Sequence, residues 1–209
     1  MQKSAIVTII VIIAFVGFGI FLMGVDGPGG TSDNGGREVE GLSADDWVTG
    51  NAASDVVLIE YGDFQCPACG VFHPIVSQLK QEFGDRVAFV YRHFPLRSIH
   101  PNAEPAARAT EAAGMQGKFW EMHDKIFENQ EQLSIESLKI WAIQIGLNSI
   151  QFGNCLDSAK YFAEVEQDLQ AGIAAGVRAT PTFFVNGQRI EGAIPFTTFE
   201  QIILSELSR

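Results

Sequence analysis

The sequence predicts an α/β fold preceded by one N-terminal transmembrane helix, and three observations lead to this prediction. An uncharged apolar segment occupies residues 5–25. Short apolar runs typical of strands lie at both ends of the remaining chain, at residues 56–59 and within residues 180–192. Between them, apolar residues recur at helical spacing. The predicted order is therefore β-α-β, a helical block, then β-β-α.

The composition indicates a packed, acidic domain. Of the 209 residues, 46 % are hydrophobic and 16 are Phe, which is ample for a core and argues against disorder. From Asp26 onward there are 13 basic and 25 acidic residues, a net charge of −12. Such a surface should not bind nucleic acid non-specifically. Three cysteines are too few for a disulfide scaffold.

Residues 1–25 are predicted to form a transmembrane signal-anchor. The run from Ala5 to Val25 holds 21 residues without a charge, enough to span a hydrocarbon core of roughly 30 Å. Lys3 precedes it and Asp26 follows, so the positive-inside rule places the N-terminus in the cytoplasm. A cleaved signal peptide would have a shorter apolar core and a clear cleavage site. We expect a single-pass protein of the cell membrane, with its domain on the extracytoplasmic side, in the periplasm or at the cell surface, where disulfides persist.

Residues 26–46 are predicted to be a flexible linker, and residues 47–209 the folded domain. Gly, Pro, Ser and Asp dominate residues 26–41, and no apolar period is visible there. A helical insertion is expected at about residues 98–176. The linker would tether the domain to the membrane.

The domain opens with a strand that leads directly into a helix. Val56–Ile59 is a continuous apolar run, as expected for a strand buried on both faces. Cys66 and Cys69 follow, and then apolar residues at helical spacing, which Gly84 ends. These helical positions are Phe72, Ile75, Val76, Leu79 and Phe83. The pair therefore lies at a strand-to-helix junction, with Cys66 as N-cap and Pro67 at the first helical position.

The remaining elements follow from similar signals. Arg86–Phe94 is predicted as a second strand, Pro105 as the start of an Ala-rich helix, and Ser134 as the N-cap of a helix that ends at Gly146. Asn186-Gly187 is typical of the turn of a hairpin. Further helices are marked by Phe119, Met122 and Ile126, by Phe162, Val165, Leu169 and Ile173, and by Phe199, Ile202, Ile203 and Leu207.

The cysteine pair allows three interpretations: a zinc site, a fixed disulfide or a redox-active pair. A zinc site needs four ligands, and beside the pair the sequence offers only Cys155 and His73, so no metal is expected. His73 lies further along the same helix and is expected to point toward its exposed side. A fixed disulfide across three residues closes too small a loop to stabilise much. A redox-active pair fits best, because a helix N-terminus stabilises a thiolate and lowers the pKa of Cys66. Cys69, one turn inside the helix, would resolve a mixed disulfide.

Thr180-Pro181 precedes the first strand of the hairpin. Pro cannot donate to a strand ladder and is found at strand starts, so an ordinary trans proline is one interpretation. The other is a cis-proline that faces the cysteine pair and leaves its neighbour's backbone free to bind a substrate chain. The residues alone leave both open.

The segments "IEYGDFQCPAC" and "CLDSAKYFAEVEQDLQAGIAAGVRATPTFFVNG" resemble the DsbA-like thiol–disulfide oxidoreductases of the thioredoxin superfamily, over roughly residues 42–209. The resemblance implies a thioredoxin-like fold, a central mixed sheet flanked by helices with an inserted helical subdomain. It implies that Cys66 is the nucleophile and Cys69 the resolving thiol. It also implies that Pro181 is cis and that Thr180 precedes it in the site.

The resemblance places Glu60 at the family's buried acidic position, where it would relay a proton to Cys69. A strand-end carboxylate facing water is the alternative, but Ile59 and Tyr61 on either side favour burial. Ala68 stands where the most oxidising members carry a histidine, so a less extreme reduction potential is expected.

The expected function is disulfide formation in exported proteins. Reduced exported proteins would be substrates, and the family implies a membrane redox partner, a quinone-linked oxidase of the DsbB or VKOR type. No cofactor is expected, and the chain is expected to be a monomer. Isomerases of this superfamily are often dimers with a separate dimerisation domain, and since none is visible an oxidase is favoured. The alternatives are a reductase or isomerase fed by a membrane electron donor, and a thioredoxin-like binding or holdase module.

Overall fold

The computed structural model describes residues 41–158, 160–190 and 194–209. The signal-anchor predicted at residues 1–25 and most of the predicted linker lie outside these residues. Within the described part, none of the helices has the length and apolar character needed to cross a membrane.

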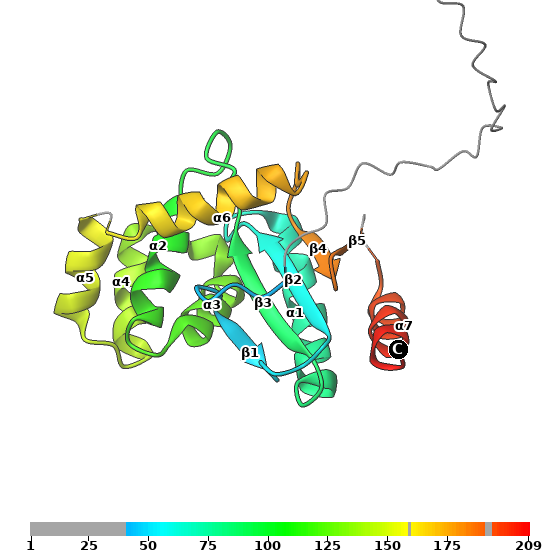
Figure 1. Ribbon diagram of the computed structural model, residues 1–209. Helices are drawn as coiled ribbons and strands as arrows, with labels where there is room; N and C mark the ends of the chain where they lie inside the picture. The colour runs from blue at the N-terminus through cyan, green and yellow to red at the C-terminus, as the bar shows by residue number, and fades with distance from the viewer. Residues whose placement is uncertain (1–40, 159, 191–193) are drawn as a thin grey trace, which may run out of the picture. The chain divides into compact units, whose positions relative to one another are not determined.

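A mixed sheet lies at the centre of the domain (Figure 1). Its described strands are β1 (Val48–Gly50), β2 (Val57–Gly62), β3 (Ala88–His93), β4 (Thr182–Val185) and β5 (Gln188–Ile190). Their order across the sheet is β1-β3-β2-β4-β5. Strands β2 and β3 are parallel, and every other pair is antiparallel. The sequence predicted the mixed sheet and four of these strands, but not the three-residue strand β1.

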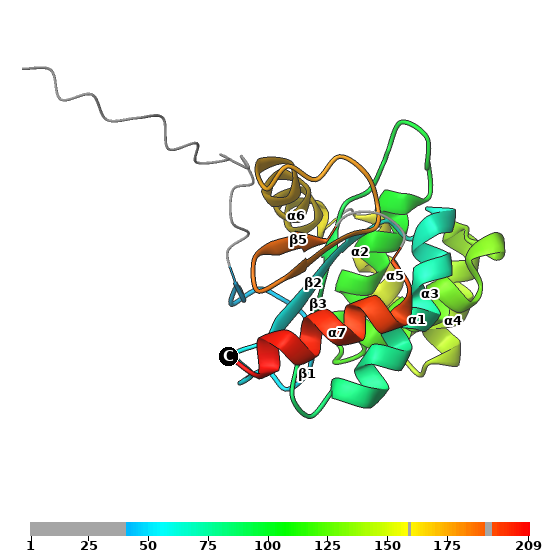
Figure 2. The same ribbon diagram turned by 90° about the vertical axis from the view of Figure 1, so that its right-hand side faces the viewer.

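Helices cover both faces of this sheet (Figure 2). Helices α1 (Pro67–Phe83) and α7 (Phe196–Leu207) pack on one face, where Leu79 and Phe199 meet Leu58, Phe89 and Phe183. Helix α6 (Phe162–Ala174) packs on the other face. Because strands β2, β3 and β4 are buried on both faces, their sequences are nearly continuous apolar runs.

Helices fill the chain between β3 and β4, where the insertion was predicted at about residues 98–176, and those before α6 share one apolar cluster with Phe64, Cys66 and Cys69. It contains α2 (Ala103–Gly114), α3 (Phe119–Glu128), the short 3₁₀ helix η1 (Gln130–Gln132), α4 (Ile135–Gln144) and α5 (Ser149–Asp157). Ser134 caps α4 as predicted, accepting the Ser137 N–H at 3.1 Å. Helix α2 begins two residues before Pro105, which is possible because first-turn N–H groups have no partner within the helix. Helix α5 was not predicted.

Residues 41–46, the end of the predicted linker, belong to the folded domain. The Asp46 carboxylate receives two hydrogen bonds from Arg92 on β3, both 2.8 Å long, and both side chains are less than a tenth exposed. The same guanidinium donates to the Gly41 carbonyl oxygen at 3.0 Å. The pairing of Asp46 depends on a residue 46 positions away, so no local signal in the sequence distinguishes residues 41–46 from the linker.

Candidate active site

Cys66 lies where β2 passes into α1. Strand β2 ends at Gly62, and the Asp63 carbonyl oxygen accepts the Cys66 N–H at 3.0 Å, which closes the turn. Cys66 is the N-cap of α1 with extended backbone angles, φ −71° and ψ 121°, and Pro67 is the first helical residue. This is the junction that the sequence predicted. It aims free backbone N–H groups at the Cys66 sulfur.

The groups around its sulfur make Cys66 an acidic thiol. The hydrogen bond from the Cys69 thiol is the largest cause that lowers the pKa of Cys66, from 9.0 to about 5, and burial opposes it. Thr180 and the backbone N–H groups of Cys69 and Ala68 lower it further. At neutral pH Cys66 is therefore a thiolate.

Cys69 has the opposite character. Its side chain is completely buried, and its Sγ accepts the Asp63 N–H at 3.5 Å. Burial raises the pKa of Cys69 well above 9.0, and the neighbouring Cys66 and Glu60 raise it further. One thiol of the pair is thus ionised and the other keeps its proton, which is the arrangement that a nucleophile and a resolving thiol require.

Glu60 is buried on β2, as predicted, with 5 % of its surface exposed. Burial raises its pKa from 4.5 to about 8, Lys80 opposes this shift, and Cys66 adds to it. Glu60 is consequently protonated at neutral pH and electrostatically coupled to Cys69. Such a group can supply or accept a proton inside the core.

Thr180 and Pro181 stand directly beside the pair. The Thr180–Pro181 peptide bond is cis. Thr182 pairs with Tyr61 in the sheet, which brings the residues before β4 next to the end of β2. The Cys66 Sγ lies 3.4 Å from the Thr180 carbonyl oxygen. The structure thus brings together the residues that the sequence and the resemblance assigned to the site.

Asp63 is a buried residue of the site that the sequence analysis missed. Its carboxylate accepts the N–H of Gln65 at 2.7 Å and the N–H of Leu96 at 2.8 Å. The same carboxylate lies 2.8 Å from Nδ1 of His100. Asp63 therefore fixes the loop between β2 and α1 against the loop after β3.

Gln130 is a second missed residue, and it comes from the helical insertion. Its side-chain amide donates to the carbonyl oxygens of Phe64 and Cys66, at 2.9 and 2.8 Å. Gly70 allows this approach, because a side chain at that position would collide with the Gln130 amide oxygen. No local signal marks Gln130, since it is 64 residues from Cys66 along the chain.

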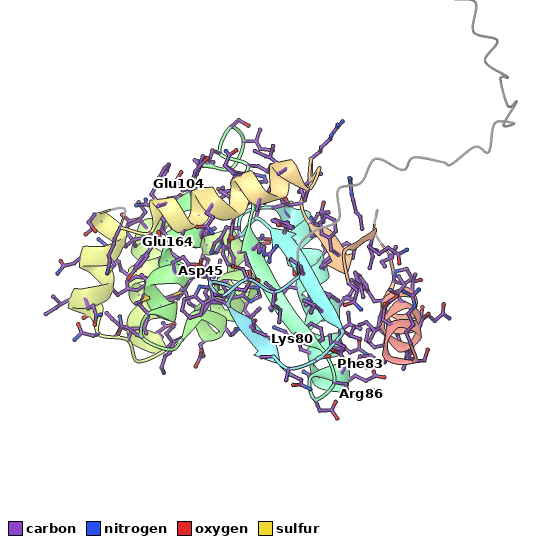
Figure 3. The ribbon with its side chains drawn as sticks, in the orientation of Figure 1. Asp45, Lys80, Phe83, Arg86, Glu104 and Glu164 are labelled. Atoms are coloured by element: carbon purple, nitrogen blue, oxygen red, sulfur yellow. The ribbon has the colours of Figure 1, made fainter. Side chains whose placement is uncertain are left out.

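A cavity of about 910 Å³ lies elsewhere, between residues 41–47, β3 and α6. Asp45 and Glu164, both labelled in Figure 3, belong to its lining, as does Arg92. Neither cysteine lines it.

Residues 43–204 match the family described as Thioredoxin. The chain belongs to this family. Its fold is similar to that of BdbD from Bacillus subtilis, with 26 % identity and a TM-score of 0.72 over 78 % of this chain and 92 % of that one. Wolbachia pipientis α-DsbA1 has the same fold at 20 % identity, with a TM-score of 0.72 over 80 % of this chain and 94 % of that one. The chain is thus a DsbA-like member of the thioredoxin family, as the resemblance implied.

Curated sequence relatives carry a different name. A 149-residue segment, 70 % of this chain, is 41 % identical to part of Na(+)/H(+) antiporter NhaA 1 from Mycolicibacterium vanbaalenii. A protein of the same name from Salinispora arenicola is 40 % identical over 148 residues, 71 % of this chain. The chain spans about a quarter of the length of these relatives, 24 % and 22 % respectively. The word antiporter in their name describes those much longer proteins as wholes.

Proposed function

We propose that the chain is a disulfide oxidase that introduces disulfides into exported proteins through Cys66 and Cys69. The observation that carries this proposal is the difference between the two thiols. Cys66 has a pKa of about 5, whereas burial raises the pKa of Cys69 well above 9.0. A stable Cys66 thiolate stabilises the reduced pair, so the oxidised pair is an effective acceptor of electrons.

The reaction follows from this asymmetry. A substrate thiolate attacks Sγ of Cys66 in the Cys66–Cys69 disulfide, and Cys69 leaves as a thiolate. A second substrate thiolate then attacks the substrate sulfur of the mixed disulfide, and Cys66 leaves as a thiolate. The substrate loses two electrons to become a disulfide, and the enzyme pair gains them.

Glu60 would act in the first of these steps. The departing Cys69 thiolate is buried, and burial strongly disfavours a charge there. Glu60, with a pKa of about 8, holds a proton at neutral pH and can give it to Cys69. The reverse transfer would occur when the pair is reoxidised.

The direction of electron flow depends on the reduction potential. Thioredoxin, whose nucleophilic Cys has a pKa of about 7, has a reduction potential near −270 mV. DsbA, whose nucleophilic Cys has a pKa of about 3.5, has a reduction potential near −120 mV. The Cys66 pKa of about 5 falls between these two pKa values. Structural disulfides of secreted proteins lie below about −300 mV, so a pair of intermediate potential still oxidises their thiols.

The cellular setting is part of the proposal. The 21-residue apolar segment from Ala5 to Val25 supports a single-pass membrane protein with its domain outside the cytoplasm. The substrates would be reduced exported proteins, and a quinone-linked membrane oxidase of the DsbB or VKOR type would reoxidise the pair. We propose that the chain works as a monomer.

The first experiment is to equilibrate the full-length chain with glutathione buffers and measure the reduction potential of the pair. We expect a value between about −120 and −270 mV. A value near −270 mV, the thioredoxin range, would identify a reductase, and a membrane electron donor would then be sought. In parallel, the oxidised chain should form disulfides in a reduced, unfolded substrate, whereas Cys66→Ser should not. If instead the parent chain forms no disulfide but binds the unfolded substrate, and Cys66→Ser binds it equally well, a holdase would be supported; Cys155→Ser is the matched control.

A further inference from the structure

Two histidines and an aspartate meet where α1 packs against α3. His73 lies on α1, and His123 and Asp124 lie next to each other on α3. His73 was expected to point toward the exposed side of its helix. Instead its side chain is only 13 % exposed and stacks on the ring of Phe127, with 5.1 Å between ring centroids. One imidazole nitrogen from each histidine and one Asp124 oxygen all lie within 4.8 Å of one another.

Packing fixes the orientation of these groups. The His123 ring is buried edge-on against the rings of Tyr91 and Phe127, at centroid distances of 4.7 and 5.0 Å. Its Nδ1 is 2.8 Å from Oδ1 of Asp124, and this oxygen is 4.0 Å from Nε2 of His73. Within the described residues, the buried Nε2 of His123 has no hydrogen-bond partner. The ring therefore presents one nitrogen to the cluster and one to the apolar core.

We propose that His73, His123 and Asp124 form a binding site for a divalent transition metal ion of the Zn²⁺ type. Two imidazoles and one carboxylate are a common ligand set for Zn²⁺, and imidazole ligands disfavour Ca²⁺ and Mg²⁺. In a tetrahedral shell with bonds of about 2.1 Å, two ligand atoms on one ion lie roughly 3.4 Å apart. The observed spacings lie on both sides of this value, at 2.8 Å between His123 and Asp124 and 4.0 Å between Asp124 and His73, so side-chain rotations must bring the three atoms onto one ion.

The site has an entrance and room for a fourth ligand. A cavity of about 440 Å³ opens beside it, lined by His73, Asp124, Ser77, Glu128 and Trp120. The Glu128 carboxylate or a water molecule from this cavity could complete a tetrahedral shell. The cavity therefore gives a hydrated ion access to His73 and Asp124, and the buried His123 ring completes the site from inside the domain.

The Lys80 ammonium group competes with the metal ion for the Asp124 carboxylate. Its Nζ lies 3.5 Å from Oδ1 of Asp124 and 4.8 Å from the centroid of the Trp120 ring. Lys80 is labelled in Figure 3. In the absence of a metal the ammonium balances the carboxylate, and an incoming ion must displace it. This is feasible because the lysine side chain is a flexible four-carbon stem, but it costs affinity.

Such an ion would join the helix that carries the active-site cysteines to the helical insertion. His73 is four residues after Cys69 on α1, whereas His123 and Asp124 belong to α3. The site was not predicted from the sequence, because its two histidines are 50 positions apart and neither lies in a metal-binding motif.

The test is a titration of the full-length chain with Zn²⁺ in competition with a chromophoric chelator. Cys155→Ser serves as the background, and the Cys66–Cys69 disulfide is kept oxidised, because free thiols also bind Zn²⁺. We expect one ion per chain. His73→Gln and Asp124→Asn should weaken binding by at least about a hundredfold, since loss of even an outer-shell partner costs roughly 10- to 100-fold. His100→Gln, which removes another histidine paired with a carboxylate, should leave the affinity unchanged.

Lys80→Gln gives an independent test that leaves all three ligands in place. Removal of the competing ammonium should tighten Zn²⁺ binding by up to about tenfold. Co²⁺ added in place of Zn²⁺ should give a tetrahedral visible spectrum that His73→Gln abolishes. No stoichiometric binding, or equal affinities in the parent chain and His73→Gln, would overturn the proposal. So would weaker binding in Lys80→Gln.

Discussion

At the scale of single residues, the acidity of Cys66 depends on its partner more than on its position at a helix end. The hydrogen bond from Cys69 is the largest cause that lowers the pKa of Cys66 to about 5. We therefore predict that Cys69→Ala raises this pKa by about 1 to 2, because a hydrogen bond to a charged group is worth about 1.5–3 kcal/mol. The pH dependence of Cys66 alkylation measures it. A midpoint that stays at about 5 would assign the acidity to the backbone instead.

The raised pKa of Glu60 predicts that the stability of the folded chain depends on pH. The folded chain keeps the Glu60 proton up to a pH of about 8, whereas the unfolded chain releases it near the ordinary pKa of 4.5. Between these values the folded state binds more protons, so the contribution of Glu60 is complete below pH 4.5 and is lost as the pH rises to 8. The loss is at most about 5 kcal/mol.

Glu60→Gln should remove this dependence, because the amide imitates the protonated carboxyl group. Urea unfolding of the oxidised chain at several pH values measures the effect in both proteins. The variant should gain stability relative to the parent as the pH rises through this window. Parallel curves for the two proteins would show that Glu60 ionises normally in the folded state.

At the scale of elements, the active-site loop is held from the helical insertion. Gln130 on η1 donates to the carbonyl oxygens of Phe64 and Cys66. Gln130→Ala should cost about 1–3 kcal/mol, because two backbone acceptors lose their partner, and it should slow mixed-disulfide formation. Gln132→Ala, an exposed neighbour in the same turn, is the control.

Gly70 supplies the matching half of this contact. A side chain at Gly70 would meet the Gln130 amide, so Gly70→Ala should destabilise the parent more than it destabilises Gln130→Ala. A double-mutant cycle of urea unfolding measures the difference. Strictly additive effects would mean that the two residues do not interact.

The elements differ in how far the sequence could predict them. Strand β2, the start of α1 and the Asn186-Gly187 turn carry local signals: an apolar run, Pro at the first helical position, and residues suited to positive φ angles of 48° and 80°. Strand β1 was missed because three half-exposed residues have no readable period. In the site, Cys66 and Cys69 could be predicted from their spacing in the sequence. Asp63 and Gln130 could not be predicted in this way, because their roles depend on partners distant in the chain.

At the scale of the whole molecule, the redox state of the pair should set the stability of the fold. In the reduced, folded chain Cys66 loses its proton at a pH of about 5, whereas in the unfolded chain it does so near 9.0. Between these values the folded state binds fewer protons, so the reduced chain becomes more stable as the pH rises, and this contribution is lost as the pH falls to 5. The oxidised chain has no Cys66 thiolate and therefore lacks this pH-dependent contribution to stability.

We therefore predict that the reduced chain gains about 2 kcal/mol over the oxidised chain between pH 5 and pH 7. Urea unfolding of both forms measures this difference, and the Glu60 contribution largely cancels because both forms contain it. Reduced Cys66→Ser should show no such gain. A difference that does not change with pH would mean that Cys66 is an ordinary thiol in the folded chain. A gain of the expected size would show that folding energy favours the reduced pair, and hence that the oxidised chain tends to pass its disulfide to a substrate.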